Sequence, residues 1–338
     1  MRALLADVLG DPAAADLPAG TPLLAGGLGL DSVTVVRLLA AIRDVLGVDV
    51  ADLDLDLDAL RTVGTLVAFV AAHSGSPAAA HGGSPAAAHG GSPAAAHGGS
   101  PAAADGGSPA AAHGGNPAAA GPVGAGMRIG IVGTGLIGGT LARLLVADGH
   151  EVAVSNSRDP DTLQQVAAEL GPAARALRAA EAAAYGELVV VSIPFGRYRE
   201  LPPEPFAGKI VLDTGNYYPA RDGRIAELDE HRATSAGLLA GHLAGARVVK
   251  AFNTIYWEHL RDGGRPDAPA RDRPAIPIAG DDAAAKAVVT ELIDRLGFTA
   301  VDTGLLVDSW RQEPGAPVYG AEVGPDQAVA LIAQARRG

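Results

Sequence analysis

The stretch MRIGIVGTGLIGG limits the possible folds of this chain more than any other. A short apolar strand, Ile129–Val132, runs into glycines at the GxGxxG spacing, Gly133, Gly135 and Gly138, and a helical pattern follows from Thr140. The first glycine permits a tight turn, the second lets backbone approach a pyrophosphate, and the third lets helix and strand pack closely. The N-terminus of the helix offers N–H groups and a positive dipole end. The stretch therefore predicts a dinucleotide site.

Strand and helix patterns alternate through the rest of residues 127–338. The expected strands are Glu151–Asn156, Leu188–Ser192, Ile210–Asp213, Val248–Ala251, Ala275–Ala279 and Thr299–Asp302, and the expected helices are 160–170, 179–185, 282–296 and 325–337. This alternation predicts a doubly wound, mostly parallel α/β sheet. The last helix would pack on the sheet or on a second subunit, which leaves a homodimer open.

The end of the second expected strand indicates which dinucleotide is bound. An NAD-specific fold places an acidic side chain there for the ribose 2′-hydroxyl. Here the strand leads into Ser157 and Arg158, with no acid before Asp159. A hydroxyl and a guanidinium suit a 2′-phosphate, so the sequence favours NADP over NAD.

Residues 1–73 read as a small helix bundle. Apolar residues at helical spacing mark one helix from about Ser32 to Leu46, namely Val35, Leu38, Leu39, Ile42, Val45 and Leu46. Shorter helices are expected at 2–10 and 63–72. Ten Asp and four Arg, with no Glu or Lys, give this module a net charge of −6.

Residues 74–126 repeat the unit SPAAAHGG, with His81, His89, His97 and His113 in register. Alanine is its only apolar residue, so the repeat is predicted to be a disordered tether. Roughly 50 residues of such a chain span about 40 Å. We favour incidental histidines over a loose metal site.

Composition excludes several classes of function. The net charge of −12 argues against a nucleic-acid partner, and the absence of cysteine excludes disulfides and thiolate chemistry. No signal peptide and no apolar run of about 20 residues is visible, so we expect no membrane partner and a cytoplasmic location.

GLGLDSVTVVRLLAAI and the downstream LDLDALRTVGTLVAFV resemble an acyl or peptidyl carrier protein. The resemblance implies a 4′-phosphopantetheine arm on Ser32, with Gly29, Leu30 and Asp31 completing the motif. It also implies a phosphopantetheinyl transferase, an adenylation or other loading enzyme and further biosynthetic enzymes as partners of the acidic surface. The alternative is that Ser32 only caps a helix.

The segments MRIGIVGTGLIGG, VVVSIPF, VLDTGN and VVKAFNTI resemble NADP oxidoreductases of the deazaflavin-coenzyme-dependent type, over residues 127–320. The resemblance implies hydride transfer involving NADPH. Its site residues match Thr134, Leu136 and Ile137 with the three glycines at the dinucleotide turn, Ser157 and Arg158 at the 2′-phosphate, and Pro194, Phe195, Asn216, Ala251 and Asn253 around the nicotinamide.

Tyr217 and Tyr218 depart from the resembled pattern, which commonly has a T-N-P turn there. Tyr218 is either a proton donor or a packed wall, and we group it with Asn216 and Asn253 as the candidate catalytic residues. Lys250 is predicted to be paired within the fold.

The leading hypothesis is an NADPH-dependent reductase of natural-product biosynthesis, acting on a substrate tethered as a thioester to its own carrier domain. In the alternatives, a deazaflavin coenzyme is the redox partner and the carrier only localises the enzyme, or the nucleotide-binding domain is an idle scaffold.

Overall fold

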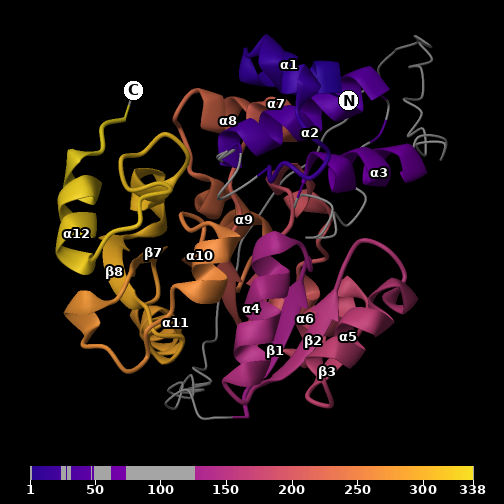
Figure 1. Cartoon of the computed structure of the whole chain (residues 1–338). Helices are drawn as coiled ribbons and strands as arrows, with labels where there is room; N and C mark the ends of the chain where they lie inside the picture. Colours follow the sequence, from indigo (N-terminus) through magenta and orange to yellow (C-terminus); the bar gives the residue numbers. More distant parts are fainter. Residues whose placement is uncertain are drawn as a thin grey trace, which may run out of the picture. The chain divides into compact units, whose positions relative to one another are not determined.

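The computed structural model describes residues 2–23, 28, 32–46, 48, 62–73 and 126–337 (Figure 1). The predicted tether lies outside these residues apart from Gly126, and so do Gly29, Leu30 and Asp31 of the carrier motif. Ser32 is described as the first residue of a helix, but its side chain is not.

The N-terminal module is helical, as predicted. Its elements are α1 (Arg2–Leu9), the 3₁₀ turn η1 (Pro12–Asp16), α2 (Ser32–Leu46) and α3 (Val63–His73). Leu38 and Ile42 of α2 are fully buried with residues of α1 and α3. The predicted apolar stripe on α2 does not continue inward to its end, because Val45 in the last turn is 66% exposed.

The C-terminal domain is built on one sheet. Its strands are β1 (Arg128–Val132), β2 (Glu151–Ser155), β3 (Ala174–Ala176), β4 (Leu188–Val191), β5 (Ile210–Asp213), β6 (Arg247–Lys250), β7 (Ala275–Gly280) and β8 (Thr299–Gly304). They lie in the order β3-β2-β1-β4-β5-β6-β7-β8, and all neighbours are parallel except β6 and β7. The predicted mostly parallel sheet is confirmed, with a short edge strand, β3, that the sequence pattern did not reveal.

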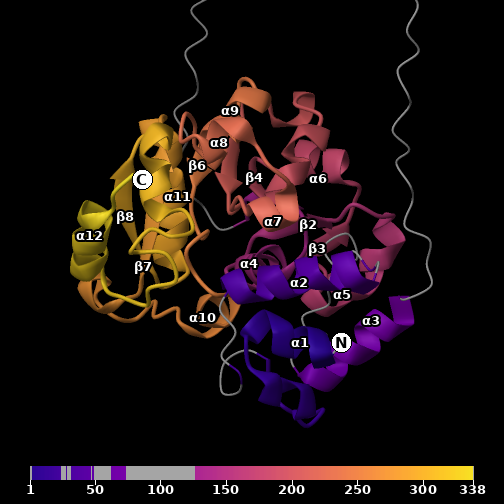
Figure 2. The same ribbon diagram turned by 90° about the horizontal axis from the view of Figure 1, so that it is seen from above.

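Helices cover both faces of this sheet (Figure 2). One face packs against α4 (Leu136–Ala147), α5 (Gln164–Leu170), α10 (Trp257–Asp262) and α11 (Ala283–Arg295), and the other against α6 (Ala179–Tyr185), η4 (Phe195–Glu200), α8 (Ala226–Asp229) and α9 (Ser235–His242). The remaining elements are η3 (Pro160–Leu163), η5 (Glu204–Phe206), α7 (Pro219–Asp222), η6 (Ala270–Asp272), η7 (Leu306–Gln312) and α12 (Pro325–Gln334). Within the described ranges, no helix is both long and apolar enough to cross a bilayer.

The central strands consist of uninterrupted apolar residues because both of their faces are covered. In β4, Leu188 and Val190 join the cluster on the α4 face, while Val189 and Val191 join the cluster on the α9 face. All four are at most 2% exposed. Continuous runs of this kind are typical of parallel strands that lie between two helix layers.

The strand order predicts a crevice at one edge of the sheet, beyond the carboxyl ends of β1 and β4. From β1 the chain builds outward through β2 and β3, and then returns to place β4, β5 and β6 on the other side of β1. Ligands of doubly wound sheets bind beyond the carboxyl ends of the strands at such a reversal. Since β7 is antiparallel to β6, and Ala279 pairs with Lys250, the beginning of β7 also lies at this edge.

Candidate functional site

The three motif glycines occupy the positions that their predicted tasks require. Gly133 has φ +97°, and a Cβ there would lie 2.3 Å from the carbonyl oxygen of Ser192. A Cβ on Gly138 would lie 2.0 Å from the carbonyl oxygen of Gly133, so helix and turn meet too closely for a side chain. Among the described residues, a Cβ on Gly135 would meet nothing within 4 Å.

The open side of the turn fits a pyrophosphate. Residues 134–137 are all partly exposed, and Gly135 is the N-cap of the twelve-residue helix α4. The hydroxyl of Thr134 donates to the carbonyl oxygen of Ser155, 2.9 Å away, which ties the turn to β2. The helix begins at Leu136, four residues before the predicted start, because glycines in its first turn obscure the helical pattern.

The end of β2 carries the two groups that suit a 2′-phosphate. Ser157 and Arg158 are exposed just beyond the strand. The backbone N–H of Arg158 donates to the Oδ1 atom of the buried Asn156, at 2.9 Å, which fixes the loop. Asp159, the first acid in this loop, forms an ion pair with Arg178 at 3.0 Å. The first acidic side chain after this strand is therefore paired within the fold.

The residues predicted around the nicotinamide differ in their exposure. Pro194 is partly exposed at the start of η4, while Phe195 is 2% exposed and stacks on Tyr198 with ring centroids 4.7 Å apart. Ala251 is fully buried in the main apolar cluster. Pro194 thus faces solvent beyond the carboxyl end of β4. Phe195 and Ala251 lie instead in the apolar clusters on the two faces of the sheet.

Lys250 is paired within the fold, as predicted. The β5–β6 register sets it beside Asp213, and both side chains are at most 2% exposed. Its ammonium donates to Asp213 Oδ2 at 3.1 Å, to the carbonyl oxygen of Gly215 at 2.6 Å and to the hydroxyl of Ser235 at 3.0 Å. All three N–H donors are used, so this charge anchors the loop after β5.

Two tyrosines meet at the crevice. The phenol oxygens of Tyr218, after β5, and Tyr319, before α12, lie 2.5 Å apart. Burial, together with Tyr319, raises the pKa of the Tyr218 phenol well above its usual value of 10.0. The Arg221 guanidinium lies 5.0 Å from the Tyr218 ring centroid. The Tyr218 phenol therefore keeps its proton at neutral pH.

The two predicted asparagines also come together. Asn216 Nδ2 donates to the carbonyl oxygen of Asn253 at 2.7 Å, and Asn253 Nδ2 donates to Asn216 Oδ1 at 3.0 Å. Asn253 follows Phe252, a buried residue with φ +59°, a conformation that a bulky side chain rarely adopts. Such strained backbone clusters at functional sites. Gln312 joins this group, although nothing in the sequence around it indicated a role.

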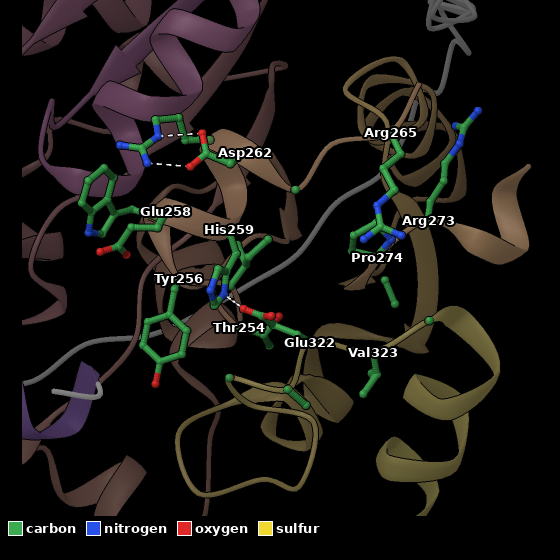
Figure 3. A pocket seen from close by; sticks show the side chains of 18 of the residues that line it. Thr254, Tyr256, Glu258, His259, Asp262, Arg265, Arg273, Pro274, Glu322 and Val323 are labelled. Atoms are coloured by element: carbon green, nitrogen blue, oxygen red, sulfur yellow. Dashed lines mark hydrogen bonds and ion pairs between the residues drawn. The ribbon is translucent and has the colours of Figure 1, made fainter. Parts of the chain in front are cut away.

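A cavity of about 830 Å³ is lined in part by the residues that follow Asn253 in the chain. Its lining includes Thr254 and Tyr256, just after Asn253, and Glu322, shortly after Tyr319. Figure 3 shows the His259 side chain directed toward Glu322, with Arg265, Arg273 and Pro274 farther along the lining. A cavity of this size accommodates a small organic ligand.

Two family models match the chain. Residues 1–70 match the phosphopantetheine attachment site model, and residues 128–217 match the model described as NADP oxidoreductase, coenzyme F420-dependent. The first match includes Ser32, and the second includes the glycine turn, Arg158 and Asn216. The two matched segments lie on either side of the predicted tether.

Individual proteins are similar to part of the chain. The metalloreductase STEAP3 of Rattus norvegicus is 32% identical over 184 residues, which are 54% of this chain and 35% of the relative. The chain spans less than half the length of the curated relatives it matches. A hypothetical protein from Sinorhizobium meliloti has a crystal structure with TM-score 0.51 and 28% identity, covering 59% of this chain and 95% of the other. A candidate F420-dependent NADP reductase from Arthrobacter sp. FB24 gives TM-score 0.46 and 29% identity, covering 55% of this chain and 88% of the other.

Proposed function

We propose that this chain reduces a substrate that is bound as a thioester to the arm on its own Ser32. The chain joins a carrier domain of the phosphopantetheine attachment family to an oxidoreductase domain of the coenzyme F420-dependent NADP oxidoreductase family. The observation that carries the proposal is that one polypeptide contains both a substrate carrier and a dinucleotide crevice with intact glycine geometry. Attachment raises the local concentration of the substrate, since its reaction becomes intramolecular.

The crevice residues divide the binding of NADPH between them. The turn at Gly135 and the N-terminus of α4 bind the pyrophosphate, because both offer backbone N–H groups and open space. Ser157 and Arg158 bind the 2′-phosphate through charge-assisted hydrogen bonds. Pro194 and Asn216 border the nicotinamide. When bound, NADPH supplies the hydride.

Tyr218 supplies the proton that reduction of a carbonyl or imine also requires. A phenol is protonated at neutral pH, so Tyr218 holds a proton before the reaction. Its short hydrogen bond to Tyr319 gives it a partner from which the proton is replaced. Asn216 and Asn253 hold the loops after β5 and β6 in register around it.

The carrier domain places this reaction within a series of enzymes. A phosphopantetheinyl transferase must attach the arm to Ser32, and a loading enzyme such as an adenylation enzyme must attach the acyl or aminoacyl group. This organisation is suited to natural-product biosynthesis. The net charge of −6 on residues 1–73 is suited to attracting these partners.

The family match supports a second candidate function. In it, a deazaflavin coenzyme exchanges the hydride with NADP, and the carrier domain only localises the enzyme. Hydride transfer between two ring systems needs positioning and little acid–base assistance. Tyr218 and Ser32 would then be dispensable for turnover.

Intact-protein mass spectrometry after co-expression with the loading enzymes tests the proposal. The wild type is expected to gain the arm and its cargo on Ser32, and the cargo to gain the mass of two hydrogen atoms when NADPH is added. Ser32→Ala is the matched control and should show neither change. A cargo that remains unreduced, in a wild-type protein that exchanges hydride with coenzyme F420 as fast as Ser32→Ala does, would establish the second candidate.

A further inference from the structure

Three amide side chains link the loops that surround the crevice, and we call Asn216, Asn253 and Gln312 the amide cluster. Asn216 follows β5, Asn253 follows β6, and Gln312 ends η7. Gln312 is fully buried and Asn253 is 4% exposed, while Asn216 is partly exposed. Only Asn216 therefore presents appreciable surface to the crevice.

Backbone carbonyls fix the orientation of each amide. Asn216 Nδ2 donates to the carbonyl oxygen of Asn253 at 2.7 Å, Asn253 Nδ2 to that of Gln312 at 2.6 Å, and Gln312 Nε2 to that of Pro277 at 3.1 Å. A carbonyl oxygen only accepts hydrogen bonds, so each contact identifies the amide nitrogen. The polarity of the whole cluster is set in this way.

The inner amides have no hydrogen left for a ligand. Asn253 donates one hydrogen to Gln312 and the other to Asn216 Oδ1, at 3.0 Å, and its Oδ1 accepts from Gln312 Nε2, at 2.9 Å. Gln312 Nε2 donates both of its hydrogens, one to Asn253 Oδ1 and one to the carbonyl oxygen of Pro277. Asn253, predicted as a catalytic residue, thus uses its polar atoms to hold its two neighbours.

Asn216 keeps one donor and one acceptor. Its Nδ2 uses one of two hydrogens and its Oδ1 uses one of two lone pairs in the contacts that the structure shows. Its carbonyl oxygen accepts from Arg221 at 2.8 Å, which holds the backbone. A fixed N–H beside a fixed lone pair is complementary to a primary carboxamide, which offers C=O and N–H in the same plane.

The position of Asn216 agrees with a carboxamide ligand. The 2′-phosphate residues Ser157 and Arg158 lie at the end of β2, and the pyrophosphate turn lies at the end of β1. Because the strand order continues β1-β4-β5, the other half of a dinucleotide extends toward the ends of β4 and β5. Asn216 stands three residues beyond the end of β5.

A glutamine at position 312 is energetically unfavourable if the side chain only fills space. Its Oε1 is buried with no hydrogen-bond partner among the described residues, and an unpaired buried oxygen destabilises a fold. Leucine or methionine would fill a similar volume without this penalty. The donor function of Nε2 is therefore what the position requires.

We propose that the amide cluster reads the carboxamide of the nicotinamide ring, with Asn216 in contact and Gln312 as the positioning residue that fixes it through Asn253. The inference rests on the proposed use of NADPH. It assigns Gln312 a role in orienting the ring and thus in presenting one face of it to the substrate. Cofactor analogues with an altered carboxamide should be discriminated against.

The test compares two ligands on the full-length protein. Binding of NADPH and of 2′-phospho-ADP-ribose, which lacks the nicotinamide ring, is measured for wild type, Gln312→Met and Asn216→Leu. Loss of the carboxamide contact predicts that both variants bind NADPH about tenfold more weakly. Binding of 2′-phospho-ADP-ribose should be unchanged, whereas a merely structural role would weaken both ligands.

Ser309→Ala is the matched control. Ser309 lies in η7 with Gln312, is fully buried, and has a hydroxyl without a partner among the described residues. Its removal should change neither affinity. Asn216→Leu changes a partly exposed position, so it still reports on the contact if Gln312→Met does not fold.

The outcomes separate this inference from the proposed function. A wild type that binds NADPH no more tightly than 2′-phospho-ADP-ribose would overturn the inference and leave the proposed function standing. Equal weakening of both ligands in Asn216→Leu would also overturn it. Failure of the wild type to bind either ligand would contradict the proposed function itself.

Discussion

The phenol oxygens of Tyr218 and Tyr319 lie 2.5 Å apart, although 101 positions separate the two residues in the chain. One follows a central strand, and the other belongs to the loop that precedes the last helix. A contact this short between two phenols requires that one donates its proton toward the other. This hydrogen bond joins the loop after β5 to the segment that precedes α12.

Replacing Tyr218 by phenylalanine is expected to slow reduction of a tethered carbonyl or imine by about 10²- to 10⁴-fold, the usual range for loss of a general acid. Affinity for NADPH should stay within about twofold, since the phenol is not assigned to cofactor binding. Single-turnover kinetics on the loaded carrier measures the first quantity, and fluorescence titration the second. Tyr217→Phe is the control, because the Tyr217 phenol already bonds Asp229 at 2.8 Å. A wild-type rate for Tyr218→Phe would remove it from the catalytic residues.

Arg158→Ala should weaken NADPH binding by about 10- to 100-fold, the range for loss of a charge-assisted hydrogen bond. NADH binding should not change, because NADH lacks the 2′-phosphate. Isothermal titration with both cofactors gives the ratio of their affinities. Arg224→Ala removes an arginine whose side chain is 87% exposed and pairs with Asp229, and it controls for net charge. An unaltered ratio in Arg158→Ala would mean that another group selects the cofactor.

Replacement by alanine should affect stability at one glycine of the motif and cofactor binding at another. Gly138→Ala forces a methyl group against the carbonyl of Gly133 and should lower the free energy of unfolding by about 1–3 kcal/mol. Gly135→Ala adds its methyl to open space, so stability should hold while NADPH binding weakens. The melting temperature without NADPH measures stability, and its increase on adding NADPH measures binding. Equal melting temperatures of the two variants without NADPH would contradict the packing argument.

The buried His150 predicts a loss of stability in acid. Its Nε2 lies 3.0 Å from Asp148 Oδ2, and burial lowers its pKa below the ordinary 6.5. The unfolded chain therefore takes up a proton as pH falls through about 6.5, while the folded chain does not until a lower pH. This part of the stability is complete above pH 6.5 and declines below it. His150→Gln should flatten the slope of unfolding free energy between about pH 7 and pH 5.5 in chemical denaturation. Parallel curves for the two proteins would show that His150 does not contribute.

Sequence patterns predicted the sheet well because each central strand is a continuous apolar run between turn residues. The helices at 179–185 and 283–295 were found for the related reason that their apolar and alanine-rich patterns are regular. The glycine turn was recognised because its chemistry is local. Its helix start was misplaced because two glycines weaken the helical signal.

The contacts that complete the candidate site could not be predicted in the same way. Gln312 and Tyr319 lie in irregular segments without periodicity, and their partners are far away in the chain. The β7 reversal that brings these segments to the crevice leaves no mark on the strand pattern itself. Such pairings become visible only when the register of the whole sheet is known.

The stretch from Gln312 to Val323 is fastened at both ends. Gln312 bonds Pro277 and Asn253, and the carbonyl of Val323 accepts from the N–H of Ala275 at 2.9 Å. Tyr319 lies between these two attachments. The number of residues on either side of it therefore determines where its phenol is placed. Variants of this protein should therefore tolerate substitutions along the stretch more readily than insertions or deletions. A single inserted residue would move the Tyr319 phenol away from Tyr218.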